Sequence, residues 1–485
     1  MSQAIEGLKP ELLWKYFAAI CQIPRGSKNE KAVARYVVDT AKKLGLEVKQ
    51  DRSGNVVARK PASPGREKVP SVCLQGHLDM VCEKNADKVH DFLKDPIELV
   101  RKGNMMMANG TTLGADNGVA VATNLAIMAD KSLVHGPLDF LFTIDEETGL
   151  TGANGLESGF LKSRTLLNLD SEEEGELYVG CSGGKDCTGT WKLDAEPAAA
   201  TLTPVEVKVT GLKGGHSGLE IDKGRGNALK IINRVLWRLA GLGGRLSRID
   251  GGNKRNAIPR EATALVYVPK AKVDAARTAV AEMNETAKAE LATVEPDLLV
   301  SLVVPKPIRG GKVIKRGLER RLLLTIAGLP HGVIKMSADI PGLVETSTNV
   351  AMLTTGKKDI TLATSQRSSV ASEIVEINDT VRAVFELGGA TAKGSDGYPG
   401  WKPDLTSAIL KLASSTYREL FGKEPAVKAV HAGLECGIIG EKYPGMDMVS
   451  FGPTLQAVHS PDEKIFIDTV EKFWIFLLAL LKKVK

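Results

Sequence analysis

The chain has 485 residues, of which 43% are hydrophobic and 25% charged, and because this length exceeds the size at which a single core stops growing we expect at least two domains. The net charge of +6 is spread over 64 basic and 58 acidic residues without a long basic block, which argues against a nucleic-acid-binding protein. The six cysteines form no CxxC pair, the first residues include acids where a signal peptide is apolar, and the apolar C-terminal segment is too short to span a bilayer. We therefore expect a reduced, cytoplasmic protein that does not bind membranes.

The first part of the chain alternates between helix and strand patterns. Helices are predicted over 10–23, over a segment that begins after a Ser27 or Asn29 N-cap and ends at Gly45, and over 118–129. Strands are predicted over 47–51, 55–60, 69–81, 138–144 and 165–170. This alternation is typical of an α/β layer with a largely parallel sheet, in which ligands bind beyond the carboxyl ends of the strands.

From about residue 188 the pattern changes. Residues 203–304 predict the order β-α-β-β-α-β of a ferredoxin-like layer, and a helix-strand-strand-helix set follows over about 313–388. Residues 388–404 are rich in Gly and Pro and indicate a return link, after which helices are predicted over 407–422 and at the C-terminus. We interpret the chain as a discontinuous catalytic domain, residues 1–187 and 398–485, interrupted by an inserted α+β lid, residues 188–397.

Three consecutive carboxylates, Asp145, Glu146 and Glu147, follow the predicted buried strand in the segment FTIDEETGLTG. Ionised carboxylates at the end of a buried strand are costly unless they are solvated on a rim or neutralised by a cation or a bound metal. The segment taken alone leaves both alternatives open.

Other acids and histidines occupy comparable positions. His77 and Asp79 lie two residues apart on an extended segment and share a face, so one can bind a metal while the other orients it. Taken singly, Asp116 resembles a helix N-cap, Asp170 a solvated strand end and His459 a surface histidine. Together the candidates supply two imidazoles and three carboxylates, a donor set that suits zinc, from His77, Asp116, Glu147, Asp170 and His459.

Segments along nearly the whole chain resemble the M20 metallopeptidases, specifically their bacterial dipeptidase branch. The resemblance is carried, in this order, by LQGHLDMV, GTTLGADNG, TIDEETGLTGA, NLDSEEEGELYVGC, GLKGGHSG, RNAIPREA, HAGLECG and HSPDE. It implies a di-metal aminopeptidase-like catalytic domain, of the phosphorylase/hydrolase type, with an inserted ferredoxin-like lid.

The resemblance also implies roles for the acids and histidines. Asp116 would bridge two divalent metal ions, with His77 and Asp170 completing one site and Glu147 and His459 the other. Asp79 would orient His77, and Glu146 would be the general base for a metal-bound water. Zinc is the expected metal, with manganese and cobalt as alternatives. Asp145 receives no role.

Substrate contacts are implied in the same way. His216 would stabilise the oxyanion, Asn256 would lie close to the substrate, and Arg367 would bind its free carboxylate bidentately. Glu435 would accept the free amine, with backbone contacts from Gly433. Taken alone, His216 and Asn256 could equally be turn residues, and His431 is as compatible with a structural role as with a functional one.

The resemblance implies hydrolysis of dipeptides with free N- and C-termini, including Xaa-His substrates such as β-alanyl-histidine, by a homodimer that pairs through the lid. The alternatives are a tripeptidase or an amino-acid deacylase with the same metal centre and a different lid. A metal-dependent scaffold that had lost hydrolysis would lack Glu146 or a metal ligand, and all of these residues are present.

Overall fold

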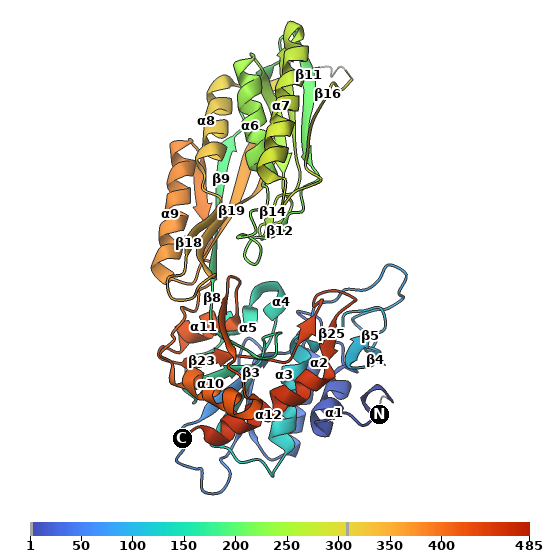
Figure 1. Cartoon of the computed structure of the whole chain (residues 1–485), viewed down its shortest axis with the longest axis vertical. Helices are drawn as coiled ribbons and strands as arrows, with labels where there is room; N and C mark the ends of the chain where they lie inside the picture. The colour runs from blue at the N-terminus through green and yellow to red at the C-terminus, as the bar shows by residue number, and fades with distance from the viewer. Residues whose placement is uncertain (1–2, 307–309) are drawn as a thin grey trace. The chain divides into compact units, whose positions relative to one another are not determined.

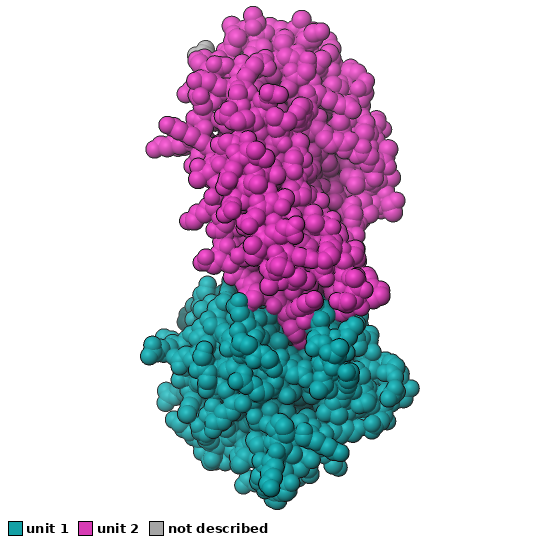
Figure 2. All heavy atoms as spheres, turned by 90° about the vertical axis from the view of Figure 1, so that its left-hand side faces the viewer, with its two compact units in different colours: residues 1–180, 403–429, 434–485 teal, residues 181–402, 430–433 magenta. Residues whose placement is uncertain are grey.

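The computed structural model describes residues 3–306 and 310–485, and in this part of the chain the residues cluster into two compact units, coloured separately in Figure 2. Unit 1 comprises Met1–Gly180, Pro403–Ala429 and Leu434–Lys485, and unit 2 comprises Cys181–Lys402 and Val430–Gly433. The segment interpreted as a lid from the sequence, 188–397, lies within unit 2. Residues 181–187, 398–402 and 430–433, which the sequence analysis placed in the catalytic domain, cluster with unit 2 instead.

Unit 1 is built on one large sheet with helices packed against it (Figure 1). The central strands β6, β3, β7 and β23 run parallel, whereas β1 with β2, β2 with β6, and β23 with β8 are antiparallel. The prediction of a largely parallel sheet is therefore correct only for its centre. In spatial order the strands are β1 (Glu47–Gln50), β2 (Val56–Lys60), β6 (Leu138–Thr143), β3 (Val72–His77), β7 (Thr165–Asn168), β23 (Asp447–Ser450), β8 (Glu176–Cys181) and β22 (Ala426–Val430).

The helices of unit 1 follow the apolar periodicity of the sequence. Helix α3 is rich in small Ala and Val residues, is buried along most of its length, and packs on α1 and β3. Helix α12 packs against α10 and buries Val470, Phe473 and Leu477, which confirms the predicted docked C-terminal helix. The helices are α1 (Glu11–Ile20), α2 (Lys31–Lys43), α3 (Ala115–Ala129), the short α4 (Glu146–Gly149) and α5 (Thr151–Gly155), α10 (Ala408–Phe421), α11 (Glu435–Lys442) and α12 (Ile467–Lys483).

Two further features complete unit 1. A small antiparallel sheet contains β24 (Leu455–Gln456), β25 (Lys464–Phe466), β5 (Met105–Ala108) and β4 (Leu99–Lys102). The predicted N-cap of α2 is wrong, because Glu30 occupies the cap position and makes no side-chain cap bond, while the Ser27 hydroxyl donates to Asp79 instead. Within the described residues, no helix has the length and apolar character needed to cross a membrane.

Unit 2 contains a second large sheet with helices packed on it (Figure 1). Its first four strands lie in the order β16, β11, β15 and β13, which is the arrangement expected for the predicted β-α-β-β-α-β run. The full order is β16 (Leu299–Val303), β11 (Leu202–Thr210), β15 (Ala262–Pro269), β13 (Arg245–Gly251), β19 (Val344–Thr355), β20 (Asp359–Ser368), β9 (Gly183–Lys192) and β21 (Thr391–Gly394), with β18 (Gly332–Met336) paired to β19.

Helices α6 (Ala228–Gly241), α7 (Val273–Leu291), α8 (Arg316–Gly328) and α9 (Ala371–Leu387) supply apolar side chains to the core of unit 2. The Gly- and Pro-rich segment 388–404 is more than a return link, because it contains β21, which pairs with β9 at the sheet edge. Two short ribbons pair β12 (Gly215–His216) with β14 (Ala257–Ile258) and β10 (Ala195–Pro197) with β17 (Lys312–Ile314).

Candidate active site

The carboxyl ends of the central strands of unit 1 carry most of the candidate metal ligands. His77 is the last residue of β3, Glu146 and Glu147 follow β6, and Asp170 lies two residues beyond the end of β7. Strands β6 and β7 flank β3 and run parallel to it, so their carboxyl ends meet at one edge of the sheet. The fold thus brings together side chains that are far apart in the sequence.

Asp116 lies between the two histidines. Its Oδ1 is 3.1 Å from His77 Nε2 and its Oδ2 is 3.2 Å from His459 Nε2. Asp170 Oδ1 lies 3.4 Å from His77 Nε2, and Glu147 Oε2 lies 3.0 Å from His459 Nε2. These contacts define two groups that share Asp116, one with His77 and Asp170 and the other with Glu147 and His459, and within each group the potential ligand atoms lie within 4.8 Å of one another.

This donor set fits two divalent cations. Three largely buried carboxylates face two imidazoles, and Glu147 Oε1 is buried without a hydrogen-bond partner among the described residues. Buried carboxylate oxygens without partners are costly unless a cation neutralises them. Mixed imidazole and carboxylate donors are those that zinc and related metals bind.

The electrostatic field of the cluster favours positive charge. Burial lowers the pKa of His77, but Asp170 and Asp116 outweigh this effect and hold the pKa well above its usual value. Hydrogen bonds to Asp116 and Glu147 raise the pKa of His459 to about 11. Burial, together with the charges of Asp116 and Glu147, raises the pKa of Asp170 to about 6. The site is therefore strongly negative when its carboxylates are ionised.

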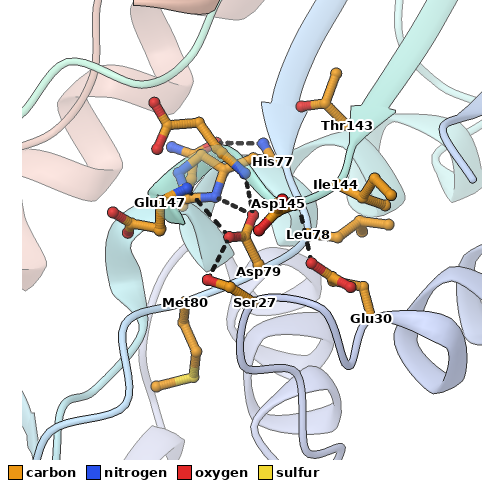
Figure 3. A network of polar contacts seen from close by, with 12 residues as sticks. Ser27, Glu30, His77, Leu78, Asp79, Met80, Thr143, Ile144, Asp145 and Glu147 are labelled. Carbon is orange, nitrogen blue, oxygen red and sulfur yellow. Dashed lines mark hydrogen bonds and ion pairs between the residues drawn. The ribbon is translucent and has the colours of Figure 1, made fainter. Parts of the chain in front are cut away.

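Asp79 connects His77 to the turn that follows β6 (Figure 3). Its Oδ1 lies 3.2 Å from His77 Nδ1, and its carboxylate accepts hydrogen bonds from the backbone N–H groups of Glu146 (3.0 Å) and Glu147 (3.2 Å). The Ser27 hydroxyl donates at 2.8 Å to Asp79 Oδ2, the oxygen that also accepts the Glu147 N–H. The sequence analysis named Ser27 only as an N-cap and missed its contact with Asp79, because no local pattern relates residues that are 52 positions apart.

Asp145, to which the sequence analysis assigned no role, organises the same turn (Figure 3). Its backbone is left-handed, with φ of 50°, and its carboxylate accepts the hydroxyl groups of Thr148 and Thr151. Its N–H donates to Glu30 Oε1 at 3.0 Å. The turn that carries Glu146 and Glu147 is thus held by Asp79 on one side and by Asp145 and Glu30 on the other.

Unit 2 carries His216, Asn256, Arg367 and Gly433. His216 Nδ1 accepts hydrogen bonds from the N–H groups of Gly218 (3.2 Å) and Leu219 (3.1 Å), which leaves Nε2 to carry the proton. Burial and the nearby Arg367 charge lower the pKa of His216 to about 4, so the ring is neutral near pH 7. Asn256, which is exposed, and His216, which is half-buried, line the same cavity of about 600 Å³.

Arg367 is buried at the end of β20, where its Nη2 lies 3.5 Å from His216 Nε2 and its Nη1 donates to the Tyr398 hydroxyl at 3.0 Å. Gly433 packs against the same tyrosine, and a Cβ at this position would lie only 2.9 Å from Tyr398 Cε2. Sequence reasoning missed Tyr398, because it lies in the segment interpreted as a link. His431 is buried and its Nε2 lies 2.6 Å from Ser347 Oγ.

Glu435 belongs to unit 1, where it is the first residue of α11 and is fully buried. Its Oε2 accepts hydrogen bonds from Gln75 Nε2 (2.5 Å) and Thr143 Oγ1 (2.6 Å), and burial raises the pKa of its carboxyl to about 7. Its Oε1 has no hydrogen-bond partner among the described residues. One oxygen therefore contacts the strands that carry the metal-ligand candidates, and the other is buried without a hydrogen-bond partner among the described residues.

The chain is similar to known proteins over nearly its whole length. The model of peptidase family M20/M25/M40 matches residues 73–483. The chain is 44% identical over 478 residues to the cytosol non-specific dipeptidase of Escherichia coli K12, covering 98% of each chain. The crystal structure of an aminoacylhistidine dipeptidase from Vibrio alginolyticus superimposes with a TM-score of 0.90 at 44% identity, covering 99% of this chain and 98% of the other.

A more distant similarity concerns the fold alone. The aminopeptidase PepT from Bacillus cereus shares 16% of its residues with this chain and superimposes with a TM-score of 0.57. Together, the matched family and the Vibrio alginolyticus structure confirm the predicted mixed α/β class.

Proposed function

The chain belongs to peptidase family M20/M25/M40, and from this premise we propose that it is a metal-dependent dipeptidase acting on dipeptides with free N- and C-termini. The proposal is carried by the convergence of four potential metal ligands on a fifth, Asp116, in a chain that is similar over 98% of its length to a cytosol non-specific dipeptidase. Xaa-His dipeptides such as β-alanyl-histidine are proposed substrates, supported by the similarity to the aminoacylhistidine dipeptidase.

Asp116 would hold both metal ions, His77 and Asp170 would complete one site, and Glu147 and His459 would complete the other. When bound, such a pair of cations lowers the pKa of a water and polarises the scissile carbonyl. Zinc is the proposed metal, with manganese or cobalt as substitutes, because sites rich in carboxylate and imidazole discriminate poorly among these ions by affinity alone.

Glu146 would take a proton from the attacking water and pass it to the leaving amine. This role is supported by its position, because a carboxylate oxygen of Glu146 lies within 4.8 Å of the potential ligand atoms of His77 and Glu147. Asp79 would keep the His77 ring in its orientation through Nδ1 and would hold the Glu146 backbone.

Unit 2 would supply groups that recognise the substrate. The protonated Nε2 of neutral His216 would donate to the developing oxyanion, Asn256 would lie close to the substrate, and the Arg367 guanidinium would pair with the free carboxylate. Glu435, through its unpaired Oε1, and the Gly433 backbone are the proposed contacts of the free amine.

We also propose that the protein acts in the cytosol, in keeping with the absence of disulfides among the described residues. We propose further that it forms a homodimer through unit 2.

The test is a substrate panel assayed with protein that has been stripped of metal and reloaded with zinc. Free dipeptides, including β-alanyl-histidine, should be cleaved, whereas a tripeptide and an N-acyl amino acid should be cleaved far more slowly. Faster cleavage of the tripeptide or of the N-acyl amino acid would assign the protein to another activity of the family. Sedimentation at micromolar concentration tests the proposed dimer, since a mass of 51.8 kDa would indicate a monomer.

A further inference from the structure

Glu463, in the HSPDE segment, has a buried carboxylate that binds four consecutive backbone N–H groups. Its Oε2 accepts hydrogen bonds from Leu113 N (2.7 Å) and Gly114 N (2.9 Å). Its Oε1 accepts from Ala115 N (2.7 Å) and Asp116 N (3.3 Å). The side chain is only 2% exposed, so water does not replace these bonds. The proposed mechanism leaves this residue without a role.

The turn that Glu463 binds delivers Asp116 to the metal-ligand cluster. Gly114 in this turn has a left-handed φ of 68°, and a Cβ there would lie 2.6 Å from Arg25 Nη2. Arg25 binds the carbonyl side of the turn. Its Nη2 donates to the Gly114 carbonyl, and its Nη1 donates to the carbonyls of Leu78 (3.1 Å) and Asp79 (2.9 Å). The Asp116 turn is therefore anchored to the segment that follows His77 through its carbonyl side, and to Glu463 through its N–H side.

The position of Glu463 in the chain adds a second link. It lies four residues after His459, and the segment between them is closed by a hydrogen bond from Glu463 N to the Ser460 carbonyl at 3.1 Å. The loop that presents His459 on one side of Asp116 thus also binds the backbone of Asp116 with a carboxylate. A shift of this loop would move His459 and the Asp116 turn together.

We propose that Glu463 is a positioning residue that sets the placement of Asp116 relative to His459 and thereby the affinity of the metal pair. This inference rests on the proposed metal centre. A carboxylate is required because each of its oxygens accepts two N–H groups, whereas an amide offers one oxygen and turns its own N–H₂ toward two of the donors. Buried donors left without an acceptor would force the turn to move.

The experiment compares Glu463→Gln with the matched control Asp462→Asn, which removes the same charge from an exposed neighbour in the same loop. Zinc affinity is measured on metal-free protein by competition with a chromophoric chelator, and the melting temperature of the metal-free form is recorded separately. Glu463→Gln should weaken zinc binding by about 10- to 100-fold, as loss of a residue that supports a ligand does, and Asp462→Asn should bind like wild type. Glu463→Asp, which keeps both oxygens on a shorter side chain, should fall between them.

The readouts separate positioning from a purely structural role. If Glu463→Gln lowers the melting temperature of the metal-free protein but binds zinc with wild-type affinity, the proposal is overturned. If Glu463→Gln does not fold, the same comparison is made with Glu463→Asp, and unchanged zinc affinity in that variant overturns the proposal equally. A wild-type protein that binds no zinc would instead refute the metal centre on which the inference rests.

Discussion

Glu146 and Glu147 are neighbours in the sequence but contact different parts of the site. Glu147 Oε2 lies 3.0 Å from His459 Nε2 and belongs to one of the two potential metal groups that share Asp116. Glu146 lies beside His77 and Glu147 in a separate group, without Asp116. The same substitution at the two positions should therefore produce different defects.

Glu146→Gln should nearly abolish turnover while zinc content stays at the wild-type value, because the change removes a base and leaves every proposed ligand in place. Glu147→Gln should instead lower zinc content by weakening one site. Steady-state kinetics and elemental analysis of both variants distinguish the two defects. Retention of most of the wild-type rate by Glu146→Gln would show that the general base is another group.

Arg367→Ala should slow hydrolysis of free dipeptides strongly, because a charge-assisted contact in a desolvated site contributes roughly 2 to 4 kcal/mol. A dipeptide with an amidated C-terminus lacks the carboxylate, so it should be a poor substrate of the wild type and should lose much less in the variant. The two changes should be non-additive when kcat/KM is measured for both substrates with both proteins.

The matched control for Arg367 is Arg255→Ala in the same unit, because Arg255 is exposed and pairs with Asp186 at 3.2 Å. This variant should treat both substrates like wild type. An equally severe loss on the amide and on the free acid in Arg367→Ala would exclude Arg367 as the carboxylate clamp.

At the scale of elements, the turn between β6 and α5 depends on Asp145. Asp145→Ala should destabilise this turn by about 1 kcal/mol, because Thr148 and Thr151 lose their carboxylate acceptor, although both threonines are exposed and water can take its place. Hydrogen exchange of peptides covering 146–155 should rise, and kcat should fall because the turn carries Glu146. Asp145→Asn, which tolerates the left-handed backbone and keeps one acceptor, should show a smaller effect.

Thr148→Val and Thr151→Val provide the controls, since each removes one of the two hydroxyl donors and should produce part of the Asp145→Ala effect. Unchanged exchange over 146–155 in Asp145→Ala would mean that Asp79 and the adjoining strand hold the turn without it.

For the whole molecule, we expect unit 2 to lose stability in mild acid. Burial, with a contribution from Lys230, lowers the pKa of His331 to about 4, whereas the unfolded side chain titrates near 6.5. Between these values the unfolded chain binds the extra proton and the folded chain does not, so stability is present above pH 6.5 and falls as the pH drops toward 4, by up to about 3 kcal/mol for this residue.

Hydrogen exchange in β19 at pH 7.5 and pH 5 measures this effect, because the Val350 N–H of that strand donates to His331 Nδ1 at 3.4 Å. In His331→Asn, compared at the same zinc content, the rate of hydrogen exchange in β19 should differ less between the two pH values than it does in the wild type. An identical pH dependence in wild type and variant would assign the acid sensitivity to other groups.

Two zinc ions per chain should be found by elemental analysis after reconstitution at neutral pH. The reason is that five potential ligands form two groups of three with Asp116 common to both. Removal of zinc with a chelator should lower the melting temperature, because a ligand that binds only the folded state stabilises it by mass action. A zinc content near zero after reconstitution would contradict the two-metal centre.

The sequence by itself determined most helices and strands, the α/β class and the family. Strongly periodic segments such as α12 form where their apolar residues recur, because local spacing decides which face a helix can bury. The candidate metal ligands could also be identified from the sequence. Imidazole and carboxylate groups at the ends of buried strands are typical of metal sites, and the family resemblance relates the separate residues to one another.

Tertiary structure decided what depends on contacts between distant segments. Ser27 donates to Asp79 rather than capping α2, residues 391–394 become a strand because β9 offers an open edge, and Asp145 receives two hydroxyl groups that follow it in a tight turn. Glu463 shows the reason most clearly, because its four donors lie about 350 positions earlier in the chain. A buried carboxylate finds its partners through the fold, and no local spacing in the sequence encodes that meeting.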